Sequence, residues 1–161
     1  MIRYFILFFL CFLITCVAKA DALPIPRFVS LRSDTVYMRS GPGERFPIEW
    51  VYKRKKYPVQ IIDSFEHWRK VEDVEKTQGW IHKKMLTGHR TALTEKGKQT
   101  VMYSKKSTNS RPLFYFEGES IVQLLNCVPN DIFCKVRYDE KKGYILKDAL
   151  FGVYPNEEID E

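Results

Sequence analysis

Two stretches of the chain repeat one another at a spacing of about 64 residues, and this repeat limits the fold more than any other feature does. The matching segments are 59–63 with 122–126, 68–71 with 133–136, and 79–86 with 143–150. Upstream, residues 36–38 match residues 101–103 more weakly. Similarity at a fixed spacing indicates that one structural unit occurs twice in tandem.

Each copy consists of short apolar and aromatic runs bounded by Gly, Pro, Asn, Asp and charged residues, a pattern typical of β-strands. In the first copy we expect strands at residues 35–38, 48–52, 57–65, 68–74, 79–82 and 90–93. A unit of this size cannot leave so many strands in an open sheet without long exposed edges. The sequence therefore predicts an all-β protein made of two small β-barrels.

The first twenty residues have the pattern of a secretory signal peptide. Arg3 supplies the positive charge, residues 4–17 are almost wholly apolar, and an A-x-A-like site ends at Ala20. The apolar run is shorter than the roughly 20 residues that a membrane-spanning helix needs, so we expect cleavage near Ala20 and no stable transmembrane anchor. The mature chain would then be periplasmic or secreted. Lipidation at Cys16 is an alternative, although Thr15 departs from the small residue usual before a lipidated cysteine.

The charge of the chain is mildly basic. Loss of Arg3 and Lys19 with the leader lowers the formal net charge from +6 to +4. That excess is too small to indicate a nucleic-acid partner, and export would remove the chain from most nucleic acid.

Residues 36–43, Val-Tyr-Met-Arg-Ser-Gly-Pro-Gly, resemble the opening motif of bacterial SH3-like (SH3b) domains. The resemblance extends over residues 35–93 through Trp68, Val71, the segment 79–82 and Leu86. The second copy, residues 100–154, keeps the later motifs but has Ser-Lys-Lys-Ser-Thr-Asn in place of the Arg-Ser-Gly-Pro-Gly turn.

The resemblance implies two tandem SH3-like barrels, each partly open and five-stranded, that recognise cell-wall peptides, other proteins or neighbouring domains. It does not imply catalysis. The expected organisation is a signal peptide over 1–20, a first barrel over 21–94, a divergent second barrel over 95–155 and a disordered acidic tail over 156–161.

Four residues of the first copy are the candidate ligand contacts. Tyr37, Phe46 and Trp50 flank the long loop between the first two strands, and Arg39 opens that loop. SH3-type grooves bind extended ligands on aromatic surfaces beside such loops. A second set is interpreted as core, because small barrels need large buried side chains: Val59, Ile61, Trp68, Val71, Trp80 and Ile81.

Gly41 and Gly43 are interpreted as turn residues that adopt positive φ around Pro42. A phosphate-binding loop is the weaker alternative, because the lysine and the spacing of a P-loop are missing. The basic run of Lys53, Arg54, Lys55 and Lys56 is expected to be a solvated hairpin tip, or else a weak contact to an anionic surface.

We expect no catalytic residue, no metal site and no cofactor. His67, His82 and His89 lack metal-ligand spacing. Cys127 and Cys134 flank a predicted hairpin turn and are expected to form a disulfide, the alternative being two small buried apolar side chains. The sequence thus predicts a non-enzymatic exported module that binds a peptidoglycan peptide or an envelope protein; the alternatives are an accessory subunit of an envelope hydrolase and a secreted effector.

Overall fold

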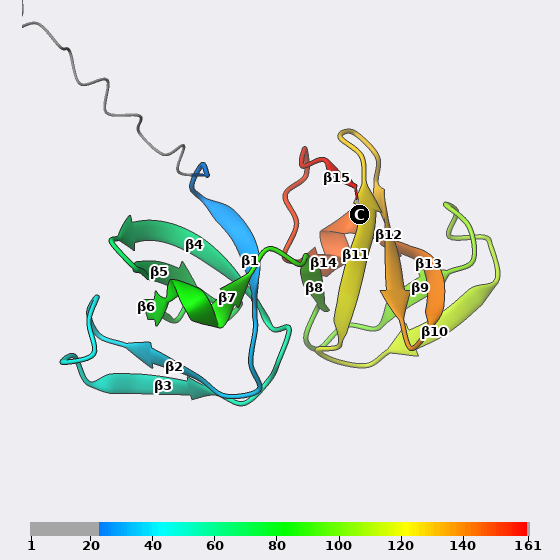
Figure 1. Ribbon diagram of the computed structural model, residues 1–161. Coiled ribbons are helices and arrows are strands. Elements are labelled where there is room, and N and C mark those ends of the chain that lie inside the picture. Colours follow the sequence, from blue (N-terminus) through cyan, green and yellow to red (C-terminus); the bar gives the residue numbers. More distant parts are fainter. Residues whose placement is uncertain (1–22, 161) are drawn as a thin grey trace, which may run out of the picture.

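The computed structural model describes residues 23–160 (Figure 1). The expected leader, its cleavage point near Ala20 and Cys16 lie outside the described residues. The rest of the chain is built almost wholly from strands, arranged in two antiparallel sheets. The prediction of an all-β fold with two small β units is confirmed at this level.

The first sheet has seven strands in the order β3-β2-β6-β5-β4-β1-β7. Their bounds are β1 Arg27–Leu31, β2 Val36–Arg39, β3 Ile48–Tyr52, β4 Pro58–Phe65, β5 Trp68–Glu72, β6 Gln78–His82 and β7 Leu86–Thr87, with a 3₁₀ turn, η1 Lys83–Met85, before β7. Strands β4, β5 and β6 form a meander, and β2 with β3 form a long hairpin that places β3 at one edge.

The second sheet has the order β10-β9-β13-β12-β11-β8-β14, and β15 pairs with β11 outside this path. Its bounds are β8 Thr91–Thr94, β9 Thr100–Tyr103, β10 Pro112–Phe116, β11 Ile121–Cys127, β12 Phe133–Tyr138, β13 Lys141–Leu146, η2 Lys147–Ala149, β14 Leu150–Phe151 and β15 Ile159–Asp160. If β8 is counted as the first strand of the second unit, as β1 is of the first, the two sheets have the same strand order.

One strand lies in a different sheet from the one expected. Residues 91–94, taken from the sequence as the last strand of the first unit, form β8 and pair with β11 and β14 of the second sheet. The physical reason is β1, to which the sequence analysis assigned no strand. Because β1 already pairs with β4 and β7, the first sheet has no open position for residues 91–94.

The two sheets enclose two apolar cores, and Leu93 of β8 is part of the core inside the first sheet. The expected core residues Val59, Ile61, Val71 and Ile81 are at most 1% exposed. The expectation that Trp68 and Trp80 are core residues was wrong, because both are only half-buried.

The two sheets meet along a packed junction. The hydroxyl groups of Ser30 on β1 and Thr91 on β8 are 2.6 Å apart and form a buried hydrogen bond. The ring of Phe28 lies 5.2 Å from that of Phe151 and 4.8 Å from that of Tyr154. Gln60 also donates to the Tyr154 hydroxyl at 2.6 Å.

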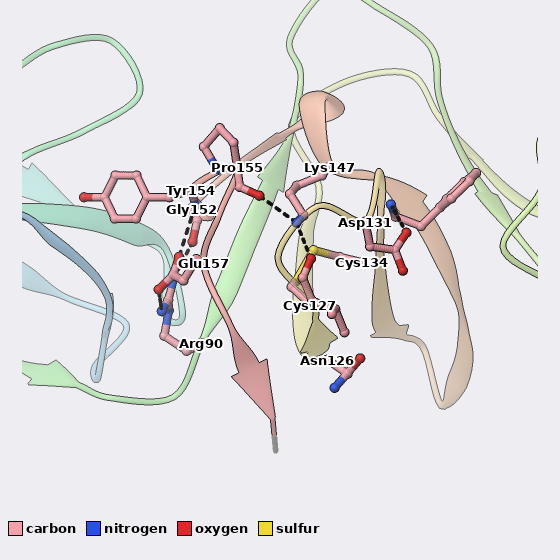
Figure 2. Close-up of a disulfide and its surroundings, with 12 residues drawn as sticks. Arg90, Asn126, Cys127, Asp131, Cys134, Lys147, Gly152, Tyr154, Pro155 and Glu157 are labelled. Carbon is pink, nitrogen blue, oxygen red and sulfur yellow. Dashed lines mark hydrogen bonds and ion pairs between the residues drawn. A yellow bond between two sulfur atoms is a disulfide. The ribbon is translucent and has the colours of Figure 1, made fainter.

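The acidic C-terminal segment is ordered through residue 160, contrary to the expected disorder. Glu157 forms an ion pair with Arg90, the residue before β8 (Figure 2). Ile159 is 6% exposed and pairs with Cys127 on β11. The buried apolar side chain and the ion pair supply the contacts that composition alone did not reveal.

Candidate ligand-binding site

The strand register brings a set of aromatic side chains to the outer face of the first sheet. Residues paired across antiparallel strands project to the same face of a sheet. Arg39 pairs with Trp80, Trp68 pairs with His82, and Phe65 pairs with Trp68. We call the surface formed by Tyr37, Arg39, Phe65, Trp68, Trp80 and His82 the outer aromatic face.

This surface is open to solvent. Tyr37 is 51% exposed and Phe65 is 52% exposed, while Trp68, Trp80 and His82 are half-buried. Rings that are anchored by their neighbours and still accessible offer large apolar contact area at a small cost in conformational entropy.

Two histidines border the aromatic side chains of this surface. The rings of His67 and His82 are 6.1 Å apart, and Trp68 stands edge-on to His82 at 5.3 Å. Burial lowers the pKa of His82, and the cations Lys84 and Lys83 and the neighbouring His67 lower it further, against an opposing effect of Glu44. The neutral imidazole is therefore favoured, and it can both donate and accept a hydrogen bond.

The loop between β2 and β3 folds back over its own glycines. A Cβ atom on Gly41 would lie 2.4 Å from the Phe46 ring, so glycine is required there to make room for that ring. Neither Gly41 nor Gly43 is among the residues with positive φ, which corrects the reason inferred from sequence. The loop is closed by the Arg39 guanidinium, which donates to the Phe46 carbonyl at 2.7 Å.

The structure separates the four residues predicted as ligand contacts. Tyr37 and Arg39 lie two apart on β2 and share the outer aromatic face, whereas Trp50 pairs with the buried Met38 and therefore lies on the core side. There Trp50 is 50% exposed at the edge of the sheet, with its ring 6.5 Å from that of Tyr52. Phe46 is half-buried in the loop, under the Arg45 guanidinium.

Sequence reasoning missed Phe65, Trp68, Trp80 and His82 as surface residues. Their position could have been predicted from the alternation of side chains along a strand, in which every second residue points to the same face. Because Ile81 is buried in the core, its neighbour Trp80 must face outward; because Val71 is buried, Trp68 three positions before it must do so too.

The remaining predicted features lie elsewhere. Lys53, Arg54, Lys55 and Lys56 are exposed in the loop between β3 and β4, as expected. The loop is not the expected hairpin tip, because β3 pairs with β2 and β4 pairs with β1 and β5. Cys127 and Cys134 form a disulfide across β11 and β12 (Figure 2). Among residues 23–160, no cluster of three or more His, Cys, Asp or Glu could hold a metal ion. The same residues include no helix long and apolar enough to cross a membrane.

Comparison with known proteins agrees with this description of the first sheet. The family described as bacterial SH3 domain matches residues 32–88, which run from the end of β1 past β7. No curated protein matches the chain.

Similar solved structures include two proteins from Trichomonas vaginalis. NlpC2 is 20% identical with a TM-score of 0.36, and the match covers 81% of this chain and 49% of that one. NlpC1 is 20% identical with a TM-score of 0.35, covering 81% and 47%. The chain thus spans about half the length of these structures.

Proposed function

We propose that this protein is an exported, non-enzymatic binding module whose outer aromatic face binds an extended ligand from the cell envelope, either a cell-wall peptide or an envelope protein. The observation that carries the proposal is the alignment of Tyr37, Phe65, Trp68 and Trp80 on one accessible sheet face. The match of residues 32–88 to a bacterial SH3 domain supports it.

The chemistry of the face suits a peptide. Apolar rings bind apolar side chains and the flat faces of amides, and Arg39 and Lys70 add positive charge beside Trp80. Asp63 on β4 lies opposite Lys70 in the strand register, so this face of the sheet carries charges of both signs. A ligand with alternating apolar and charged groups would find partners for each.

The test is retention of the full chain, expressed with its N-terminal segment, on isolated cell-wall sacculi and in an envelope extract. The variant Tyr37→Ser/Phe65→Ser removes two aromatic side chains that are about half exposed, so the fold is expected to persist. We expect it to lower retention about tenfold or more, the effect of losing an aromatic interface anchor. Trp50→Ser is the matched control, because Trp50 is equally exposed on the opposite face of the same sheet.

Equal retention of the double variant and the wild-type chain would contradict the proposal, as would an equal loss in the control. Retention of a hydrolase from the envelope extract, in place of sacculi, would identify an accessory subunit. Release of soluble wall fragments by the purified chain would instead identify an enzyme.

A further inference from the structure

A cleft of about 400 Å³ lies where the two sheets meet, away from the outer aromatic face. Four basic residues line it: Arg32, Lys55, Lys56 and His89. The other lining residues are neutral, and none carries a carboxylate. Small-molecule sites begin at roughly this volume, so the space suits a small ligand or the head of a larger one.

The four basic residues of the loop between β3 and β4 form two pairs: Lys53 and Arg54 have hydrogen-bond partners for their side chains, whereas Lys55 and Lys56 have none in the described part of the chain. The Lys53 ammonium donates to the Thr35 hydroxyl at 3.3 Å, and Arg54 donates to the Glu119 carbonyl at 2.6 Å. Within residues 23–160, the ammonium groups of Lys55 and Lys56 have neither a hydrogen bond nor an ion pair. The two lysines that line the cleft are thus adjacent like charges without a protein counter-charge, an arrangement that a bound anion would stabilise.

The backbone of Lys56 is fixed by both halves of the molecule. Lys56 has φ 64°, in the left-handed region, and its N–H donates to the Leu31 carbonyl of β1 at 2.9 Å. Its own carbonyl accepts from the Thr91 hydroxyl of β8 at 2.6 Å. Because β1 and β8 belong to different sheets, the position of this lysine depends on the junction between them.

Arg32 is a further basic residue that lines this cleft, and its position is fixed by hydrogen bonds. Its backbone N–H donates to the Met85 carbonyl at 2.9 Å, and its Nε donates to the Leu86 carbonyl at 3.2 Å. Within residues 23–160, the terminal nitrogens of this guanidinium have no protein hydrogen bond or ion pair, and a guanidinium fork matches two oxygens of a phosphate group.

We propose that this junction cleft is a binding site for a phosphate-class oxyanion, held by Lys55, Lys56 and Arg32. Two sources carry that chemistry: a free phosphate or phosphomonoester, and the headgroup of an anionic phospholipid. The proposal is independent of the outer aromatic face, which lies on the first sheet alone.

The experiment titrates the full chain with inorganic phosphate and with glycerol phosphate by calorimetry at low ionic strength. In parallel it measures co-sedimentation with vesicles of phosphatidylcholine alone and of phosphatidylcholine mixed with phosphatidylglycerol. The test variant is Lys55→Gln/Lys56→Gln. The control is Lys105→Gln/Lys106→Gln, which removes the same number of charges but also removes the ion pair of Lys106 with Asp131. The control removes two lysines from the loop between β9 and β10, at the far end of the second sheet (Figure 1).

We expect saturable binding that weakens about tenfold or more in the Lys55→Gln/Lys56→Gln variant, unchanged in the control, and that declines with added salt. Binding of the soluble phosphates would identify a free ligand, and binding only to phosphatidylglycerol vesicles would identify a headgroup; either supports the site. The proposal would be overturned if the chain bound neither the soluble phosphates nor the vesicles, or if the test and control variants lost binding equally. The Tyr37→Ser/Phe65→Ser variant should bind phosphate normally, which separates this result from a failure of the proposed function.

Discussion

Tyr52 and Asp73 form a polar pair inside the core of the first sheet. Both side chains are buried, and the Tyr52 hydroxyl donates to Asp73 Oδ2 at 2.9 Å. Asp73 Oδ1 accepts from the backbone N–H groups of Glu75 and Thr77 at 3.0 and 2.9 Å. One carboxylate therefore closes the turn between β5 and β6 and also connects that turn to β3.

This pair predicts a loss of stability at alkaline pH. Burial, followed by the hydrogen bond and the charge of Asp73, raises the pKa of Tyr52 far above its usual value. Burial and the same carboxylate raise the pKa of Tyr57 to about 12. Because both tyrosines bind protons more tightly when folded, their contribution to stability is complete below about pH 10 and declines above it. The contribution of Tyr57 is lost as the pH rises through about 12, and that of Tyr52 is lost only at higher pH.

The measurement is the free energy of unfolding from urea titrations at steps between pH 8 and pH 12. We expect a steady decline above about pH 10 in the wild-type chain and a shallower decline in Tyr57→Phe. Tyr37→Phe is the control, because Tyr37 is half exposed and outside the core. A slope equal in all three proteins would show that Tyr57 does not contribute to the alkaline limit.

At the scale of elements, the β11–β12 hairpin and the C-terminal segment support one another. Cys127 and Cys134 lie directly opposite each other on the two strands of the hairpin, with their Cα atoms 4.5 Å apart. The buried Lys147 ammonium donates to the carbonyls of Val128 and Pro155, both at 2.9 Å (Figure 2). The first carbonyl belongs to the hairpin loop and the second to the C-terminal segment, so the lysine joins the two.

Removal of the disulfide should destabilise this part of the chain. For a closed loop of this length, the double variant Cys127→Ala/Cys134→Ala is expected to lose about 2 to 3 kcal/mol of unfolding free energy. Because β15 pairs with β11 at Cys127, amide hydrogen exchange should also accelerate over residues 157–160. Wild-type chain treated with a reductant should behave like the variant, and unchanged stability of both would refute the structural role of the bridge.

At the scale of the whole molecule, the two sheets are held together by contacts from several segments. Phe28 packs on Phe151 and Tyr154, Gln60 on β4 donates to the Tyr154 hydroxyl at 2.6 Å, and the Thr91 hydroxyl bonds with that of Ser30 on β1. A junction with packed rings and buried hydrogen bonds is expected to restrict hinge motion between the sheets. The geometry of the phosphate cleft depends on that restriction.

Phe28→Ala tests the junction. Phe28 is 8% exposed, so its truncation removes a ring from between the sheets and should cost about 3 kcal/mol. We expect unfolding to separate into two calorimetric transitions and the radius of gyration from solution scattering to increase. Phe65→Ala, which removes a ring that is about half exposed, is the control. A single transition at the wild-type temperature would show that the sheets do not depend on this contact.

The alternation of residues along the chain determined much of the fold. It predicted the all-β class, most strands of the two sheets, and the burial of Val59, Ile61, Val71 and Ile81, because strand period and apolar pattern are local properties. The cysteine spacing likewise predicted a bridged hairpin, which the structure contains.

Only the tertiary structure decided which strands belong together and which face each side chain occupies. Residues 91–94 joined the second sheet because β1 fills the equivalent position in the first, and pairing partners are a long-range choice. Trp50 and Tyr37 face opposite ways through the register of β2 with β3, and Ile159 is ordered by a strand more than thirty residues away. Packing and pairing between distant segments set these features, and they are not encoded in any single window of sequence.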